Sequence, residues 1–541
     1  MSGAGRTLLL GGVVYSHSDP FATALLIDDG RIAWVGDDSG AQVHVDIADQ
    51  VVHLDGAFVA PGFVDSHIHA TSTGLVLTAL DLSPVRSAGE LLDAVQTHAQ
   101  NVRGGLVYGH GWDETNWPDR TLPTRGELDR AAWGSEVYLA RVDVHSALIS
   151  SALVARVREI TEQAGYSSDG PVEQIAHEMA RTAALERLSS ASRERAQQAT
   201  LHEALANGIV AVHEMAGPSI GGAQDAQALR ALSDGQPLPK VDVYWGEVAS
   251  PQAFETARDI GAYGLGGDLF VDGSLGSRTA ALVEPYADAP THGRQYLSRD
   301  EIEHHIRLTT EAGIPGGFHV IGDAACQDVT RAFESVALDL GADRVRGAGH
   351  RIEHAEMLTR ADIASLASLG VTFSMQPVFD AWWGVSGGMY DQRLGTDRAC
   401  GMNSFADIVA AGGHLTINSD SPVTPLRPWM AVRAAMEHTN PEQRISGRAA
   451  FNAHTRAGWR AVGQVEVGTI TPGAPAHLAV WQVDDLQVRV PDERVQGWST
   501  DPRAATPGLP DLDSGDPQCL ATLVAGQCAY GHEYWESRSA G

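Results

Sequence analysis

Lysine is almost absent from this 541-residue chain, since Lys240 is the one lysine among 38 basic residues. The basic residues are themselves outnumbered by 68 acidic ones, which gives a formal net charge of −30. So acidic a chain repels polyanions, and this argues against nucleic acid or an anionic membrane as a partner. The composition favours a soluble protein that handles small molecules.

Cysteine and long apolar runs are scarce as well. No run approaches the length that crosses a membrane. The apolar stretch 8–15 contains two glycines and is not followed by a small-residue cleavage pattern, so we expect a strand and not a signal sequence. No Cys-x-x-Cys spacing occurs, and we expect reduced, mostly buried thiols in a cytoplasmic protein. The four cysteines are Cys326, Cys400, Cys519 and Cys528.

The chain is too long for a single small core, so more than one domain is expected. Short strand-like runs broken by turn residues fill 6–54 and return at 478–530. We expect residues 1–60 and 467–541 to build one small β-sandwich from both termini. The domain between them, 61–466, is expected to carry an insertion at about 75–165.

Helical and strand-like segments alternate through the central region, with helices expected at 173–207, 300–312 and 361–369. This alternation predicts an α/β fold, a (β/α)8 TIM-like barrel whose catalytic groups lie where strands end. The eight expected strands are 61–69, 209–213, 241–247, 268–272, 317–321, 351–354, 371–375 and 414–418.

Imidazoles and carboxylates gather at the ends of these expected strands, and such groups suit zinc and similar divalent ions. A single histidine on a strand is more often a hydrogen-bonded core residue, and Asp420 before Pro422 also fits a turn. Their joint placement at one end of successive strands is hard to explain in that way, so we predict a metal site. The candidates are His67, His69, Asp268, Asp272, His319, His354 and Asp420.

Seven motifs occur in order along the chain: Pro-Gly-Phe-Val-Asp-Ser-His-Ile-His at 61–69, Gly-Trp-Asp-Glu at 111–114, Asp-Gly-Ser-Leu-Gly-Ser-Arg-Thr-Ala at 272–280, His-Val-Ile-Gly-Asp at 319–323, Arg-Ile-Glu-His at 351–354, Ser-Met-Gln-Pro at 374–377 and Asn-Ser-Asp-Ser-Pro at 418–422. Together they resemble the amidohydrolase superfamily, and within it family 3, the subgroup that contains N-substituted formamide deformylases. The resemblance implies a metal-bearing barrel beside a β-sandwich. It also implies that Asp420 is both ligand and proton carrier, and that the other ligands are His67, His69, His319 and His354.

Six further residues are candidates for contact with substrate: Trp112, Asp113, His145, His213, Arg278 and Trp382. Each has a structural alternative. The first three are also compatible with loop packing or helix capping, and Arg278 with a salt bridge to one of the many acids. His213 is expected to contact substrate or to support a metal ligand, whereas Trp382 lines the pocket or packs a loop. His477 stands where the family usually has an aspartate, and we expect a structural role for it.

We predict a metal-dependent hydrolase that cleaves an amide-type carbon–nitrogen bond, N-formyl or N-acyl, of a small molecule. One or two divalent ions, zinc foremost, activate water, and Asp420 moves the proton. One alternative, a deaminase of a cyclic or purine-like substrate, is disfavoured because Gly322 stands where such relatives commonly have a glutamate. The other, a non-catalytic assembly protein, is disfavoured because the implied ligands are all present. Substrate identity and oligomeric state, a homo-oligomer included, stay open.

Asp268 is the main departure from the subgroup, in which a lysine at this position often carries a carbamate that bridges two metals. Lys240 precedes the third expected strand, roughly 20 Å from the predicted site at about 3.3 Å per residue. We therefore expect no carbamylated lysine. Asp268 is predicted either to supply a carboxylate in place of the carbamate or to leave a single-metal site. The alternative is that Asp268 lies below the site and contacts no ion.

Overall fold

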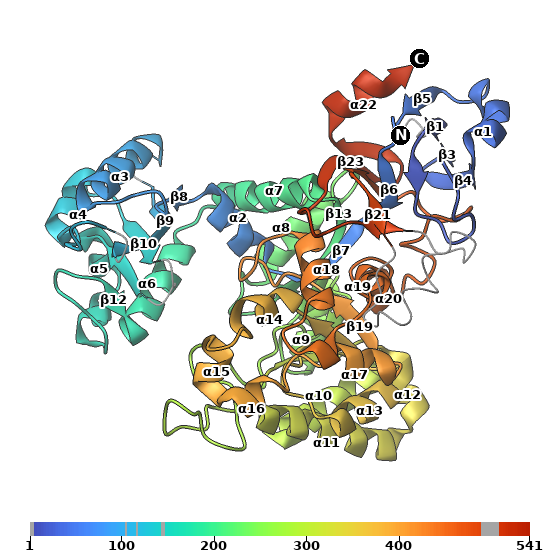
Figure 1. The fold of residues 1–541 in the computed structure, drawn as a ribbon. Coiled ribbons are helices and arrows are strands. Elements are labelled where there is room, and N and C mark those ends of the chain that lie inside the picture. The colour runs from blue at the N-terminus through green and yellow to red at the C-terminus, as the bar shows by residue number, and fades with distance from the viewer. Residues whose placement is uncertain (1–4, 103–104, 115–116, 142–145, 488–507, 541) are drawn as a thin grey trace. The chain divides into compact units, whose positions relative to one another are not determined.

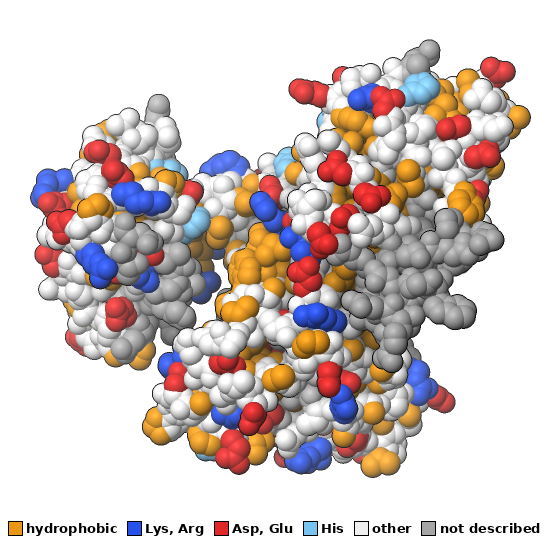
Figure 2. All heavy atoms as spheres, in the orientation of Figure 1, with side chains coloured by type: hydrophobic (Ala, Val, Ile, Leu, Met, Phe, Trp, Pro, Cys, Tyr) orange, Lys and Arg blue, Asp and Glu red, His pale blue; other side chains and the backbone are white. Residues whose placement is uncertain are grey.

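The computed structural model describes residues 5–102, 105–114, 117–141, 146–487 and 508–540 (Figure 1). The chain divides into two compact units, one formed by residues 1–70 and 201–541 and the other by residues 71–200. Within the described part of the chain, no helix has the length and apolar character needed to span a membrane. On the face drawn in Figure 2, acidic and basic side chains are interspersed.

Two parallel sheets of four strands form the centre of the larger unit. The first has the order β15-β14-β13-β7 and the second β16-β17-β18-β19. Parallel bridges join their edges, Leu265 to Gly316 and Ile68 to Ser421. The α/β class is therefore confirmed. The strands are β7 (Phe63–Ile68), β13 (Ile209–Ala216), β14 (Lys240–Trp245), β15 (Gly264–Leu265), β16 (Gly317–Val320), β17 (Arg351–His354), β18 (Thr372–Met375) and β19 (His414–Ile417).

Helices alternate with these strands, and the sequence encodes several of their ends locally. In α10, Ser298 and Glu301 form a capping box and Gly313 ends the helix in the left-handed conformation (φ 69°). The helices of this region are α8 (Ala223–Ser233), α9 (Pro251–Ile260), α10 (Arg299–Ala312), α11 (Asp323–Leu340), α12 (Ala342–Ala348), α13 (Arg360–Ser368), α14 (Pro377–Trp383), α15 (Met389–Leu394), α16 (Thr396–Ala399), α17 (Phe405–Ala410), α18 (Pro428–Met436), α19 (Gly447–Ala453) and α20 (Arg456–Ala461).

Strands from both ends of the chain build two five-stranded sheets in the same unit. Their orders are β25-β5-β1-β3-β4 and β2-β6-β20-β23-β24. The two sheets share a hydrophobic core, in which Leu9 and Val52 of the first pack with Val59, Leu478 and Leu523 of the second. The strands are β1 (Thr7–Leu10), β2 (Val13–Val14), β3 (Ala24–Asp28), β4 (Arg31–Gly36), β5 (Gln50–His53), β6 (Phe58–Pro61), β20 (Leu478–Gln482), β23 (Gln518–Val524), β24 (Gln527–Tyr530) and β25 (Ser539–Ala540), with helices α1 (Asp38–Val45) and α22 (His532–Arg538).

The smaller unit has its own sheet, ordered β12-β11-β10-β9-β8. Alternate residues of β10 enter two separate cores, Val137 and Leu139 one, Tyr138 and Ala140 the other. Both faces of the sheet are therefore covered. Its elements are α2 (Ala70–Thr78), β8 (Leu80–Asp81), α3 (Ala88–Val102), β9 (Val107–Trp112), α4 (Arg125–Ala131), β10 (Val137–Arg141), β11 (Ser146–Ile149), α5 (Ser151–Arg156), β12 (Val172–Glu173), α6 (Gln174–Glu186) and α7 (Ser190–Ala206).

Two expected elements differ in the structure. The fourth strand of the parallel set is β15, not 268–272, because Gly266 and Gly267 turn the chain with φ of 151° and 75°. After this turn Phe270 makes an isolated bridge to His319. The helix expected at 173–207 is two helices, α6 and α7. The Ser189 hydroxyl accepts a hydrogen bond from the backbone N–H of Ser192, which begins a new helix.

Candidate metal centre

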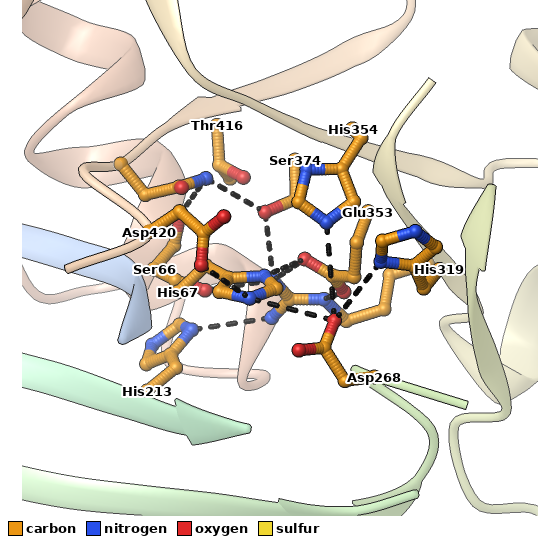
Figure 3. A network of polar contacts seen from close by, with 12 residues as sticks. Ser66, His67, His213, Asp268, His319, Glu353, His354, Ser374, Thr416 and Asp420 are labelled. Carbon is orange, nitrogen blue, oxygen red and sulfur yellow. Dashed lines mark hydrogen bonds and ion pairs between the residues drawn. The ribbon is translucent and has the colours of Figure 1, made fainter. Parts of the chain in front are cut away.

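The carboxyl ends of the parallel strands bring the predicted ligands together (Figure 3). His67 lies near the end of β7, His319 in β16 and His354 at the end of β17, while Asp420 follows β19. The backbone N–H of Asp420 donates to the carbonyl of His67 at 3.0 Å. Asp420 and His354 have φ of 51° and 68°, a left-handed conformation that is uncommon for such residues and clusters at functional sites.

Three ligand atoms form a first group around Asp420. Its Oδ1 lies 3.3 Å from Nε2 of His67 and 3.4 Å from Nε2 of His69. The three residues each offer one atom, and these atoms lie within 4.8 Å of one another. His67 and His69 thus project to the same side of the strand end, as their spacing of two residues predicted.

Asp268 lies between this group and the other two histidines. Its Oδ1 is 3.4 Å from Nδ1 of His319 and 3.8 Å from Nε2 of His354. Its Oδ2 is 3.1 Å from Nε2 of His69. The structure therefore places Asp268 level with the candidate ligands, against the alternative that it lies below them. Oδ1 also lies 3.6 Å from Nε2 of His67, so this oxygen faces histidines of both groups.

The cluster has the properties of a site for a divalent cation. Nε2 of His67, Oδ1 of Asp268, Nδ1 of His319 and Nε2 of His354 are buried and have no hydrogen-bond partner among the described residues. Leaving such an atom unsatisfied costs about 1–3 kcal/mol. Separations of 3.1–3.8 Å are mostly long for hydrogen bonds but fit atoms that share an ion about 2.0–2.2 Å from each. The donor set therefore fits a metal.

The electrostatics of the cluster lead to the same conclusion. Burial would raise the pKa of Asp420, but His67 and His69 hold it well below its usual value. Burial likewise lowers the pKa of His67, yet the carboxylates of Asp268 and Asp420 outweigh it and raise that pKa well above the usual value. Two buried, ionised carboxylates thus need positive charge beside them, which a divalent cation supplies.

A buried ion pair behind the cluster orients His67. Its Nδ1 donates to Oε2 of Glu353 at 2.9 Å, and the same oxygen accepts from Nη2 of Arg351 at 2.9 Å. Arg351 also donates to the carbonyl of Ser66 at 2.7 Å. Burial raises the pKa of Glu353, but Arg351 and His67 together lower it to about 2. Because the ionised Glu353 accepts a hydrogen bond from Nδ1–H, Nε2 is the ring nitrogen of His67 that faces Asp268 and Asp420.

Two further ligands are oriented in the same way. Nδ1 of His354 donates to Oε1 of Gln376 at 3.0 Å, and Gln376 in turn donates to Asn418 at 2.9 Å. Nε2 of His319 donates to the carbonyl of Gly273 at 3.3 Å, which leaves its Nδ1 for the cluster. Each of these histidines therefore turns its other ring nitrogen toward Asp268.

Sequence reasoning assigned no role to Arg351, Glu353, Gln376 or Asn418. A signal was present for the first two, because they stand two residues apart on an expected strand and so share a face. Opposite charges on the inward face of a buried strand indicate an ion pair, and such a pair often orients a neighbouring functional side chain. No comparable signal marks Gln376, whose role depends on a contact with His354 across the sheet.

The remaining candidates lie elsewhere or serve structure. His213 is buried and its Nδ1 lies 3.3 Å from Nη1 of Arg351, so it contacts the supporting ion pair and not the ligand cluster. Arg278 donates twice to Asp288, at 3.0 and 2.8 Å, which is the salt-bridge alternative. The Asp272 carboxylate accepts from three backbone N–H groups, those of Ala281, Ile321 and Gly322, and thus anchors loops.

The other four candidates for substrate contact have different surroundings. Trp112 is 1% exposed in a core of the smaller unit, where its Nε1 donates to the carbonyl of Leu139 at 2.9 Å. Asp113 forms an ion pair with Arg141 at 3.0 Å. Trp382, in contrast, is 44% exposed on α14. His145 lies outside the described residues. Loop and core packing therefore accounts for Trp112.

Glu353→Gln is expected to lower metal affinity by about 10- to 100-fold, because outer partners of ligating histidines contribute that much. The amide keeps the shape of the side chain but loses the negative charge that accepts the hydrogen bond from Nδ1–H of His67. Glu356→Gln is the matched control, a buried glutamate that accepts from the Tyr390 hydroxyl at 2.8 Å. Competition with a chromogenic chelator measures both affinities. Equal affinity in the Glu353 variant and the parent would exclude this role.

Comparison with known proteins accords with this site. The sequence pattern of the amidohydrolase family matches residues 50–530. Protein LONG AFTER FAR-RED 3 of Arabidopsis thaliana is 26% identical over 519 residues, 87% of this chain and 86% of that protein. N-substituted formamide deformylase of Arthrobacter pascens is 24% identical over 506 residues, 86% of this chain and 91% of that enzyme.

Solved structures add a metal-dependent enzyme to these relatives. The crystal structure of an uncharacterized metal-dependent hydrolase from Pyrococcus furiosus is 27% identical and superposes with a TM-score of 0.74, over 88% of this chain and 98% of that one. The family pattern covers most of the length, and the metal ligands expected from the sequence meet at one place in the fold. The chain therefore belongs to the amidohydrolase family and is a metal-dependent hydrolase that acts on carbon–nitrogen bonds.

Proposed function

We propose that the chain hydrolyses an amide-type bond, N-formyl or N-acyl, of a small molecule. One observation carries the proposal. His67, His69, His319, His354, Asp268 and Asp420 converge, and the facing atoms of His67, Asp268, His319 and His354 are buried without a hydrogen-bond partner among the described residues. The similarity to an N-substituted formamide deformylase supports the choice of bond. We also infer that the two parallel sheets close as a (β/α)8 barrel and that the two terminal sheets form a β-sandwich beside it.

His67, His69 and Asp420 would hold an ion at one position. His319 and His354 would hold one beside it, with Asp268 within reach of both positions. Imidazole and carboxylate ligands suit zinc. When bound, such an ion supplies Lewis acidity, which polarises a carbonyl and lets water react near neutral pH. The Asp268 carboxylate is permanently charged, so it serves without carbon dioxide where relatives use a lysine carbamate.

Asp420 is the proton carrier in this proposal. Its pKa is held low by the neighbouring histidines, so it is ionised and able to accept a proton from the attacking water. It then delivers that proton to the leaving nitrogen as the carbon–nitrogen bond breaks. Glu353 and Arg351 keep His67 in one tautomer throughout, because both are buried and bonded to each other.

Deamination is disfavoured by the surroundings of Gly322. The backbone N–H of Gly322 donates to Asp272 at 2.8 Å. A Cβ at this position would lie 2.0 Å from the carbonyl oxygen of Ala281, which excludes any side chain without a backbone shift. The glutamate that deaminases of this superfamily commonly carry there has no space in this fold.

We expect the zinc-loaded protein to release amine and carboxylate from at least one member of a panel of N-formyl, N-acyl and cyclic amides. Prolonged dialysis against a strong chelator should remove this activity, and added zinc should restore it, because the ion supplies the Lewis acid. Liquid chromatography with mass spectrometry measures both products. Cyclic amidines are tested beside this panel. Full activity of metal-free protein, or release of ammonia from the amidines with no hydrolysis of any amide, would contradict the proposal.

A further inference from the structure

A cavity lies at the amino end of β14. It has a volume of about 550 Å³, within the range of about 300–1,000 Å³ typical of small-molecule sites. β14 begins at Lys240 and has six residues, so the cavity is separated by about 20 Å of strand from the carboxyl end where the metal ligands gather. The polar side chains that line it include Arg230, Lys240, Asp242, Tyr263 and His477.

Two residues that stand out in the sequence meet in this cavity, the single lysine and the histidine at a position where relatives have an aspartate. Neither belongs to the metal centre. Nζ of Lys240 lies 3.0 Å from Oδ1 of Asp242 and 5.7 Å from the ring centroid of Trp459. Oδ2 of Asp242 is buried and has no hydrogen-bond partner within the described ranges of the chain. One wall thus offers an ammonium group and an unsatisfied carboxylate oxygen side by side.

His477 adds a neutral donor to the cavity. Its Nδ1 accepts the backbone N–H of Ala525 at 3.3 Å, so the proton of the neutral ring is on Nε2. Burial lowers its pKa to about 4, which keeps the ring uncharged near neutral pH. Its ring packs against Trp459, with centroids 5.1 Å apart.

Arg230 supplies the second cation. Its side chain packs over Gly261, where a Cβ would lie 1.6 Å from Nη1. One of its N–H groups donates to the carbonyl of Ile260 at 3.3 Å. A guanidinium has five N–H donors, and most therefore remain for another acceptor. Arg230, Lys240 and His477 together form a donor-rich side of a cavity that also carries Asp242.

We propose that this cavity binds a small zwitterion of the α-amino-acid type. The carboxylate of the ligand is held by Arg230, Lys240 and His477, and its ammonium group by Asp242. Separated charges of both signs match a zwitterion better than a simple anion, because a chain of net charge −30 repels anions but not a neutral molecule. The site is independent of the proposed hydrolysis, since none of its residues contacts the metal ligands.

The single lysine provides a local test. An amine-reactive ester is added to the zinc-loaded protein with each of the twenty common amino acids present in turn. Mass spectrometry follows modification of the peptide that contains Lys240 relative to a lysine-containing reference peptide in the same tube, which corrects for ester consumed by the added amine. At least one should slow modification severalfold. Its carboxylate-only and amine-only counterparts, which keep the same side chain, should not. Equal protection by the carboxylate-only compound, or no protection by any amino acid, would overturn the proposal.

Titration calorimetry with the protecting amino acid gives a second readout. Asp242→Asn should abolish the binding heat while turnover at the metal centre stays at the level of the parent. His477→Asp, which restores the residue usual in relatives, should weaken binding by placing a negative charge beside the ligand carboxylate. Undiminished binding in both folded variants, as judged by their melting temperatures, would refute the assignment of the site.

Discussion

Asp420→Asn is expected to lower kcat by about 10²- to 10⁴-fold, the usual cost of removing a general acid or base. The amide cannot accept the proton of the attacking water, and it cannot return one to the leaving nitrogen. The fold should persist, because the backbone N–H of Asp420 that bonds to the carbonyl of His67 remains. Turnover measured at saturating zinc separates this loss from weakened metal binding.

Asp380→Asn is the matched control for this experiment. Asp380 is also a buried aspartate, but its carboxylate accepts from the backbone N–H and the hydroxyl of Thr439, and it contacts none of the ligands. The control should lose stability and keep kcat. An Asp420 variant that turns over within a fewfold of the parent would show that another group carries the proton.

Asp268→Asn is expected to remove metal from the protein and to lower turnover by at least about 10²-fold, because even the indirect partners of metal ligands contribute about 10- to 100-fold in affinity. Both Asp268 oxygens face histidines of the cluster, so the substitution weakens both positions at once. The parent should load to the same metal content with and without bicarbonate. Metal per chain is measured by elemental analysis after removal of free ions.

This prediction has two parts, bicarbonate-independent loading of the parent and loss of metal from the Asp268 variant, and each part has its own contradicting result. A bicarbonate requirement in the parent would mean that a carbamate takes part in metal loading, which would contradict the position of Lys240 about 20 Å from the cluster. Full metal content in the Asp268 variant would mean that the remaining four histidines and Asp420 suffice. Either result would remove Asp268 from the shared position while leaving Asp420→Asn as a separate test of hydrolysis.

The convergence of the candidate ligands was predictable because strand geometry is local. His67 and His69 are two residues apart near a strand end and so point the same way, and parallel strands place His319 and His354 on the same rim. The carboxylate of Asp268 was among the predicted ligands, but the strand predicted at 268–272 is absent, because Gly266 and Gly267 turn the chain after β15. In such a turn the orientation of a side chain depends on tertiary contacts, because the regular alternation of side chains along a strand does not apply there.

Residues whose role depends on a distant partner were harder to assign. Arg278 forms its ion pair with Asp288, one of many acids that the sequence offered. The core position of Trp112 depends on the carbonyl of Leu139 in a neighbouring strand. The support that Arg351 and Glu353 give to His67 likewise crosses from β17 to β7. These contacts join residues that are far apart in the sequence. A single sequence does not show which residues of two different strands lie beside each other.

Anomalous diffraction from crystals of the zinc-loaded protein, recorded on both sides of the zinc absorption edge, tests the central claim most directly. The account predicts density at the cluster, between His67, His69 and Asp420 or beside His319 and His354, with Asp268 in contact with each ion present. Zinc found only elsewhere on the protein, with the cluster empty in crystals of active enzyme, would contradict it.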